Sequence, residues 1–174
     1  LPGYELFQYV DENGTRHSVK SSDVNAYIRE AGGHEFTAKD FRTWAGTALA
    51  AQALQAFENF DTKTQAKRNV MRAIEAVAKR LGNTKTVCRK CYIHPEVLNA
   101  YLDGSLVQTL RRRVSKELDT SLRALPPEEA AVLALLHGRL AQSDRASKEN
   151  GAGGTGASSL RDLLKKSLRR RARS

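Results

Sequence analysis

The sequence predicts a mainly α-helical protein with one small β element near its N-terminus. Over residues 64–81 the apolar side chains of Val70, Ile74 and Val77 recur at helical spacing, so they share one face of a long helix. The dipeptide Asn13-Gly14 separates two short stretches of alternating polarity, and both residues tolerate positive φ, which is typical of a hairpin turn. The rest of the chain reads as helices separated by Gly and Pro.

Capping signals set the boundaries of these helices. Thr37, followed three residues later by Asp40, resembles a capping box in which Asp replaces the usual Glu. Gly82 ends one helix, and Pro95 suits the first turn of the next. In chain order, the predicted elements are a hairpin over 5–10 and 15–19 and helices over 22–29, 38–57, 64–81, 95–102, 106–125 and 128–140.

Composition divides the chain into three parts. We expect one folded domain over residues 1–142, a flexible linker over 143–159 and a basic amphipathic tail over 160–174. The linker contains the sequence NGAGGTGA, which is typical of a flexible segment. The tail could bind nucleic acid non-specifically through counterion release, or it could be a solubilising, partly disordered extension.

The charge of the chain indicates an anionic partner. Lys and Arg number 29 against 19 Asp and Glu, a formal net charge of +10. Nucleic acid is the first candidate and a membrane surface the second. The tail carries +6 of this charge, so a basic footprint on the body must be local. No apolar run of 18 residues occurs, so we expect no membrane-spanning helix and a cytoplasmic, nucleoid-associated protein.

Tyr92 is the candidate nucleophile of the sequence. It follows a polar loop and a short basic segment that contains Arg89 and Lys90. A tyrosine hydroxyl can attack phosphorus when cations lie nearby, whereas Arg89 and Lys90 could instead hold a DNA backbone. Asn83, nine residues earlier, can donate an uncharged hydrogen bond to a phosphate oxygen. Taken singly, Tyr92 also reads as a half-buried aromatic and Asn83 as a helix cap.

A second basic pair lies near the start of a predicted helix. Lys39 and Arg42 are three residues apart, so they share one helix face near its N-terminus. A helix N-terminus with a planar guanidinium is a good phosphate site. Taken alone, however, such a pair is more often a solvated basic face.

Together, these segments carry a specific resemblance. The order FTAKDFRTWAGT, then LGNT, then RKCY resembles the catalytic domain of type IB DNA topoisomerases, and above all the short poxvirus-like enzymes of bacteria. The resemblance covers roughly residues 1–140. It implies a helical catalytic domain that acts on double-stranded DNA as a clamp-shaped monomer, without ATP, metal or another cofactor.

The resemblance also implies roles for individual residues. Tyr92 would form a 3′-phosphotyrosyl link with one strand, and Arg42 would stabilise the pentacoordinate transition state. Asn83 stands where many relatives carry His and would donate to a non-bridging oxygen. Lys39 would contact the phosphate backbone. Supercoiled DNA would relax by rotation about the uncut strand before religation.

One part of the family pattern has no counterpart in the chain. The family uses another Arg and a Lys that acts as general acid, and both lie upstream of the region that matches. The chain begins Leu-Pro-Gly without an initiator Met, so we expect it to be the C-terminal part of a longer protein, missing an N-terminal domain. Removing one such donor costs about 10²–10³ in rate, so the chain alone should be nearly inactive.

Other interpretations of the sequence stay open. Tyrosine recombinases share the chemistry, but they normally carry His three residues before this Arg, where Lys39 stands here. A non-catalytic helical DNA-binding module is a further alternative. Cys88 and Cys91 form a C-x-x-C near His94, but a structural zinc site needs four ligands, so we expect no metal.

Overall fold

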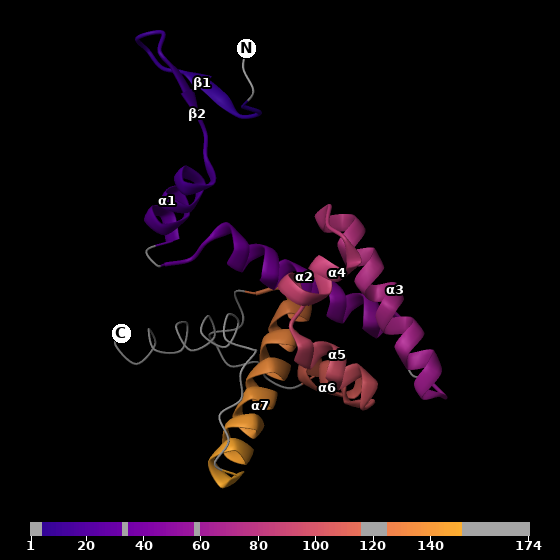
Figure 1. Ribbon diagram of the computed structural model, residues 1–174. Coiled ribbons are helices and arrows are strands. Elements are labelled where there is room, and N and C mark those ends of the chain that lie inside the picture. The colour runs from indigo at the N-terminus through magenta and orange to yellow at the C-terminus, as the bar shows by residue number, and fades with distance from the viewer. Residues whose placement is uncertain (1–4, 33–34, 58–59, 116–124, 151–174) are drawn as a thin grey trace. The chain divides into compact units, whose positions relative to one another are not determined.

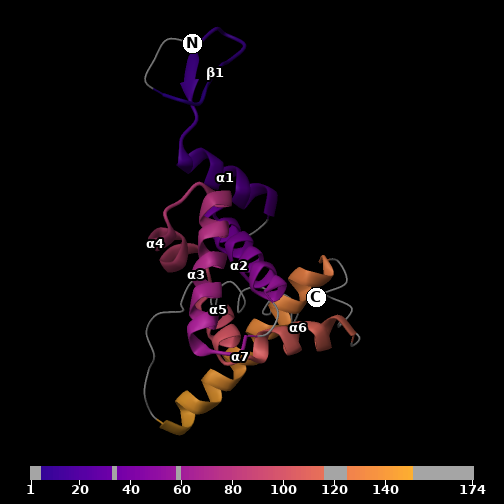
Figure 2. The same ribbon diagram turned by 90° about the vertical axis from the view of Figure 1, so that its right-hand side faces the viewer.

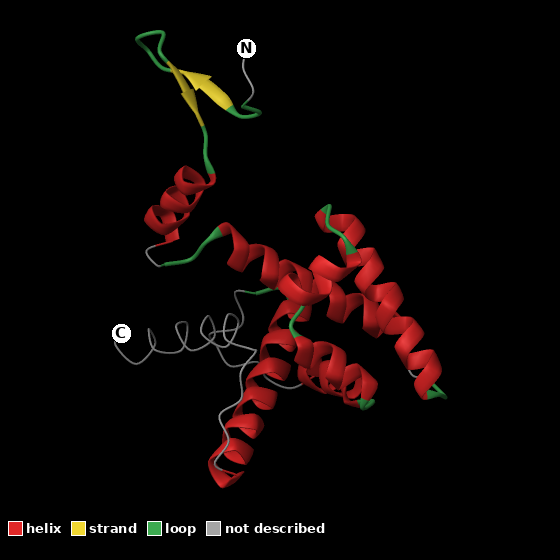
Figure 3. Cartoon of the chain, viewed as in Figure 1, coloured by secondary structure: helices red, strands yellow, loops and turns green. Residues whose placement is uncertain are grey.

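The computed structural model describes residues 5–32, 35–57, 60–115 and 125–150. These residues are mainly helical with one two-stranded sheet, as the sequence predicted (Figure 3). They fall into two compact units, and the boundary lies between Phe41 and Arg42. Residues of both units lie within the single domain that the sequence predicts over 1–142.

The first unit contains a β-hairpin and one helix. Strands β1 (Gln8–Val10) and β2 (Arg16–Ser18) pair antiparallel, with Tyr9 opposite His17. The predicted turn is confirmed, because Gly14 adopts φ 78°, where a side chain would be strained. Helix α1 (Ser21–Gly32) follows.

Helix α2 (Ala38–Ala56) begins with half of the predicted capping box. The backbone N–H and the hydroxyl of Thr37 both donate to the Asp40 carboxylate, at 2.9 and 2.8 Å. The carboxylate therefore satisfies the N-cap amide, as in a capping box, but the Thr hydroxyl donates to it instead of accepting from the helix. From Arg42 onward α2 belongs to the second unit.

The second unit packs its helices around one core. After α2 come α3 (Lys63–Leu81), the short α4 (Lys85–Val87), the π-helix η1 (Cys88–Tyr92), α5 (Pro95–Leu102), α6 (Ser105–Ser115) and α7 (Pro127–Asn150). Helix α5 contacts α3, α6 and α7, and α6 packs along α7 (Figures 1 and 2). The apolar face predicted for α3 is buried in this core.

Two predicted helix ends differ from the structure. Helix α7 continues to Asn150, ten residues beyond the predicted end at Leu140, so it overlaps the predicted linker over 143–159. Helix α6 ends at Ser115 within the described residues, and residues 116–124 of its predicted extension lie outside them. The predicted tail over 160–174 also lies outside the described residues. None of the described helices is both long enough and apolar enough to cross a membrane.

A hydrogen bond from Trp44 links α2 to α7. Its indole Nε1 donates a 2.7 Å hydrogen bond to the Glu129 carboxylate in the first turn of α7. A buried face of α2 packs beside it, including Ala50, Ala51 and Leu54. Helix α2 is thus a fixed support within the second unit, and its first residues there carry the candidate site.

We expect Asn69→Ala to destabilise the second unit by about 1–3 kcal/mol, because it leaves a buried hydroxyl without a partner. Asn69 Nδ2 donates to Tyr101 Oη at 2.7 Å, and both side chains are buried. Urea unfolding measures the loss. A double variant, Asn69→Leu with Tyr101→Phe, removes both partners and should lose less than Asn69→Ala; an equal or larger loss would contradict the assignment.

Candidate active site

The C-terminus of α3 positions Asn83. Gly82 adopts the left-handed conformation, at φ 67° and ψ 36°. The Asn83 N–H donates to the Ala78 carbonyl at 2.9 Å and the Gly82 N–H to the Lys79 carbonyl at 3.4 Å, which together form a Schellman cap. The predicted helix stop at Gly82 is confirmed, and Asn83 leaves the helix in a fixed direction.

One carbonyl at this helix end receives two side chains. Arg42 Nη2 donates to the Leu81 carbonyl oxygen at 2.7 Å, and Asn83 Nδ2 donates to the same oxygen at 3.2 Å. The last carbonyls of a helix lack helical partners and carry partial negative charge, so they attract a guanidinium. Arg42 and Asn83, forty-one residues apart, therefore converge on one acceptor.

The segment that carries Tyr92 is helical, contrary to the predicted polar loop and basic segment. Thr84 caps α4 by accepting a hydrogen bond from the Val87 N–H at 3.3 Å. Cys88 is fully buried in the core and anchors the following turn, η1, which ends at Tyr92. A π-turn of this kind is rare and is found frequently at functional sites.

Arg42 also lies against the candidate nucleophile. Its guanidinium carbon is 5.1 Å from the centroid of the Tyr92 ring, within cation–π range. Tyr92 is half-buried, whereas Arg42 is exposed and can reach a bound anion. The structure thus brings together all three residues predicted to be catalytic: Tyr92, Arg42 and Asn83.

Two of the three residues predicted to contact DNA lie directly before the candidate nucleophile in the chain. Arg89 and Lys90 are on η1, and both are exposed. Lys39 is exposed on the first turn of α2 and belongs to the first unit. Its contact with the DNA backbone stays a prediction.

Sequence reasoning missed the face of α2 that receives Tyr92. Gly46 leaves room for the Tyr92 backbone: a Cβ at this position would lie 2.4 Å from the Tyr92 carbonyl oxygen. The buried Thr47 hydroxyl accepts a 3.1 Å hydrogen bond from the His94 N–H. Gly46 lies one helical turn after Arg42, and this spacing was the available signal.

His94 is a buried histidine directly after the candidate nucleophile segment. Its Nδ1 accepts from the Glu96 N–H at 3.2 Å and so caps α5. Within the described part of the chain, no group pairs with its buried Nε2. Burial lowers the pKa of His94 below its usual value, against an opposing effect of Glu96.

Acidification below the ordinary histidine pKa of about 6.5 should therefore destabilise the protein, because the unfolded chain takes up a proton that folded His94 resists. Urea unfolding at pH 7.5 and pH 5.5 measures this loss. His94→Asn keeps an oxygen that can cap the helix but has no titrating group, so it should show a smaller loss. An equal loss in both proteins would contradict the prediction.

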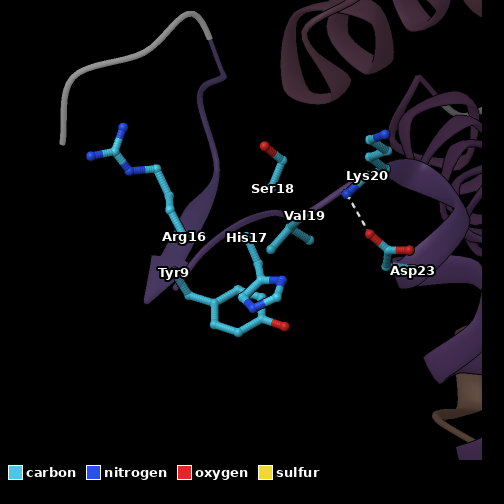
Figure 4. Close-up of a pocket in the computed structure, with 7 residues that line it drawn as sticks. All are labelled: Tyr9, Arg16, His17, Ser18, Val19, Lys20 and Asp23. Atoms are coloured by element: carbon cyan, nitrogen blue, oxygen red, sulfur yellow. Dashed lines mark hydrogen bonds between the residues drawn. The ribbon is translucent and has the colours of Figure 1, made fainter. Parts of the chain in front are cut away.

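Cys88 and Cys91 are both free thiols, and burial raises the pKa of Cys88, an effect that nearby Arg42 opposes. Among the described residues, no group of three or more His, Cys, Asp or Glu side chains is placed to hold a metal ion. A hollow of about 460 Å³ lies on the hairpin of the first unit, where Tyr9 and His17 stack (Figure 4). None of the predicted site residues lines it.

Comparison with known proteins identifies the family of this chain. A DNA topoisomerase 1B of Acanthamoeba polyphaga mimivirus is 36% identical over 108 residues, an alignment that covers 58% of this chain and 32% of the viral protein. The chain thus spans about a third of the length of that relative. The family described as eukaryotic DNA topoisomerase I, catalytic core, matches residues 1–118. Because the match extends over more than half of its length, this chain belongs to the eukaryotic-type DNA topoisomerase I catalytic-core family.

Proposed function

We propose that the protein is a type IB topoisomerase that relaxes supercoiled DNA through a 3′-phosphotyrosyl intermediate on Tyr92. One observation carries the proposal: Arg42 lies over the Tyr92 ring at 5.1 Å and shares the Leu81 carbonyl with Asn83. A nucleophile, a planar cation and a neutral donor are thereby gathered within the second unit.

The chemistry follows from what each side chain can do. The Tyr92 oxygen loses its proton to solvent and attacks phosphorus, and a phosphodiester to tyrosine forms. The bond to the 5′-oxygen breaks, and this oxygen takes a proton from the general acid and leaves as a hydroxyl. Arg42 exchanges the Leu81 carbonyl for phosphate oxygens, because two parallel N–H donors match an anionic phosphate better than a single neutral carbonyl. Asn83, held by the cap of α3, donates to a second phosphate oxygen without adding charge. Religation reverses the attack, so the energy of the broken bond is kept in the phosphotyrosine and ATP is unnecessary.

We further propose that this is a protein of the poxvirus-like bacterial kind, a monomer that closes around DNA with a domain outside these 174 residues. The chain spans 32% of its viral relative, which leaves room for such a domain. That domain would supply the general-acid Lys and the additional Arg that have no counterpart in the region of resemblance.

Plasmid relaxation tests the function. The protein extended upstream by its own preceding sequence should relax supercoiled plasmid without ATP and in the presence of a chelator, and Tyr92→Phe should abolish relaxation. Residues 1–174 alone should be slower by about 10²-fold or more, since a leaving oxygen without its acid departs poorly. Equal rates for the two chains would contradict the proposed external acid. Relaxation by Tyr92→Phe would contradict the function assigned to Tyr92.

A further inference from the structure

Three residues of α2 contact the main chain of the segment that carries Tyr92. The Thr43 hydroxyl donates to the Cys91 carbonyl at 3.4 Å, and Gly46 faces the Tyr92 carbonyl. The Thr47 hydroxyl lies 3.5 Å from that same carbonyl oxygen. The nucleophile is therefore held by its main chain, while its ring points toward Arg42.

Thr47 also makes two shorter hydrogen bonds. Its hydroxyl donates to the Thr43 carbonyl at 2.7 Å, and its oxygen accepts from the His94 N–H at 3.1 Å. The side chain is fully buried, so water cannot replace either bond at low cost. A hydroxyl has one proton, and the shorter bond uses it. The oxygen lone pairs of Thr47 are thus available to accept from the His94 N–H. This hydrogen bond fixes the position of the main chain two residues after Tyr92.

The backbone is extended directly after η1, so no helical hydrogen bond holds this part of the chain in place of the bond to Thr47. Ile93 adopts φ −117° and ψ 125°, so the chain leaves the π-turn abruptly. The His94 N–H lies at the start of α5, where helical amides have no helical partner. Without the Thr47 oxygen, this buried amide would have to move toward another acceptor and carry the Tyr92 peptide with it.

We infer that Thr47 is a positioning residue for the nucleophile, which it holds through the His94 amide at a set distance from Arg42 on the same helix. The inference rests on the proposed function of Tyr92 and Arg42. Helix α2 would then supply the phosphate ligand at Arg42 and support the nucleophile from Thr47, five residues later.

This role predicts a particular kinetic pattern. Misplacing a reacting group by about 1 Å can slow a reaction about 10²-fold. Tyr92 is the nucleophile in cleavage and the leaving group in religation, so its displacement raises the same barrier in both directions. Cleavage and religation should therefore slow by the same factor, and the ratio of cleaved to intact DNA at equilibrium should not change.

The test compares Thr47→Val, which keeps the shape and loses the hydroxyl, with Thr47→Ser, which keeps the hydroxyl. Thr64→Val, at an exposed site on the first turn of α3, is the matched control. The rate of amide hydrogen exchange at His94 reports on the hydrogen bond to Thr47. Single-turnover experiments on a duplex with the upstream-extended protein give the rates of cleavage and religation, and titration of the duplex gives the Kd.

For Thr47→Val we expect exchange at His94 to accelerate about 10-fold or more and both rates to fall about 10- to 10²-fold, with Kd unchanged. Thr47→Ser should restore both readouts to within about 3-fold of the parent, and Thr64→Val should match the parent. If Thr47→Val does not fold, Thr47→Ala takes its place with the same expectations.

Three results would overturn the inference: unchanged exchange at His94 in Thr47→Val, accelerated exchange with unchanged cleavage, or a Thr47→Ser protein as slow as Thr47→Val. A parent protein that forms no covalent adduct would instead overturn the proposed function, and with it the catalytic part of this inference. The exchange measurement would still decide whether Thr47 holds the Tyr92 segment.

Discussion

Arg42→Ala is expected to slow strand cleavage by about 10²-fold or more while duplex binding is largely kept. In the structure, the guanidinium lies between the Leu81 carbonyl, at 2.7 Å, and the Tyr92 ring, at 5.1 Å. Its removal takes away the planar donor that would stabilise the charge growing on phosphorus in the transition state. Single-turnover cleavage at saturating protein measures the loss separately from affinity.

Arg42→Lys is the matched control for this variant. It keeps the charge but replaces a rigid fork by a point charge, so cleavage should recover only in part. Full recovery in the lysine variant would show that charge alone matters. A loss of affinity with unchanged cleavage in Arg42→Ala would show that Arg42 is merely a backbone contact.

Gly46→Ala is expected to impair both the fold and the reaction. The new Cβ would lie 2.4 Å from the Tyr92 carbonyl oxygen and 3.2 Å from its carbonyl carbon. Main-chain atoms cannot avoid the new Cβ by a change of side-chain rotamer, so the whole Tyr92 segment must shift. Helix propensity gains about 1 kcal/mol, but overpacking costs about 1–3 kcal/mol or more. Cleavage should slow about 10²-fold, since the nucleophile moves by an appreciable fraction of an ångström.

Gly32→Ala is the matched control, because it lies in a helix and a Cβ there would meet no atom within 4 Å. It should leave cleavage unchanged and stability equal or slightly raised. Urea unfolding and single-turnover cleavage measure the two effects. Normal cleavage by a folded Gly46→Ala protein would contradict the close approach of α2 and Tyr92.

The sequence predicted the helices well where periodicity and capping agreed. The apolar face of α3 and its glycine stop were both confirmed, because burial and a left-handed cap act locally. The turn η1 was not predicted, since it depends on Cys88 being drawn into a core made by distant helices. The continuation of α7 beyond Leu140 was missed as well.

In the candidate site, too, some features could be predicted from the sequence and others depend on the folded structure. Tyr92, Arg42 and Asn83 could be selected from sequence because the order and spacing of their motifs resemble those of the type IB topoisomerases. The Leu81 carbonyl, which accepts hydrogen bonds from both Arg42 and Asn83, could not be predicted from the sequence. It is a main-chain group, and it is free to accept side chains because α3 ends there. Asn83 follows the glycine cap of α3, and its side-chain amide donates to the Leu81 carbonyl. Its hydrogen bond to a phosphate oxygen stays a prediction.

Thr47 was overlooked for a related reason. Its hydroxyl makes its hydrogen bonds to backbone groups, and a backbone partner leaves no residue type in the sequence that would mark Thr47. Lys39 was grouped with Arg42 by helical spacing and by the family resemblance, and the boundary between the two units falls between these residues. The role of Lys39 toward DNA stays a prediction.

The central claim is that Tyr92 is the nucleophile, and covalent trapping tests it most directly. The upstream-extended protein is incubated with a suicide duplex whose short cleaved strand dissociates, and the denatured products are separated by size. The parent should form a protein–DNA adduct whose nucleotide maps to the peptide that contains Tyr92, and Tyr92→Phe should form none. An adduct of equal yield in Tyr92→Phe, or a nucleotide attached to another peptide, would contradict the claim.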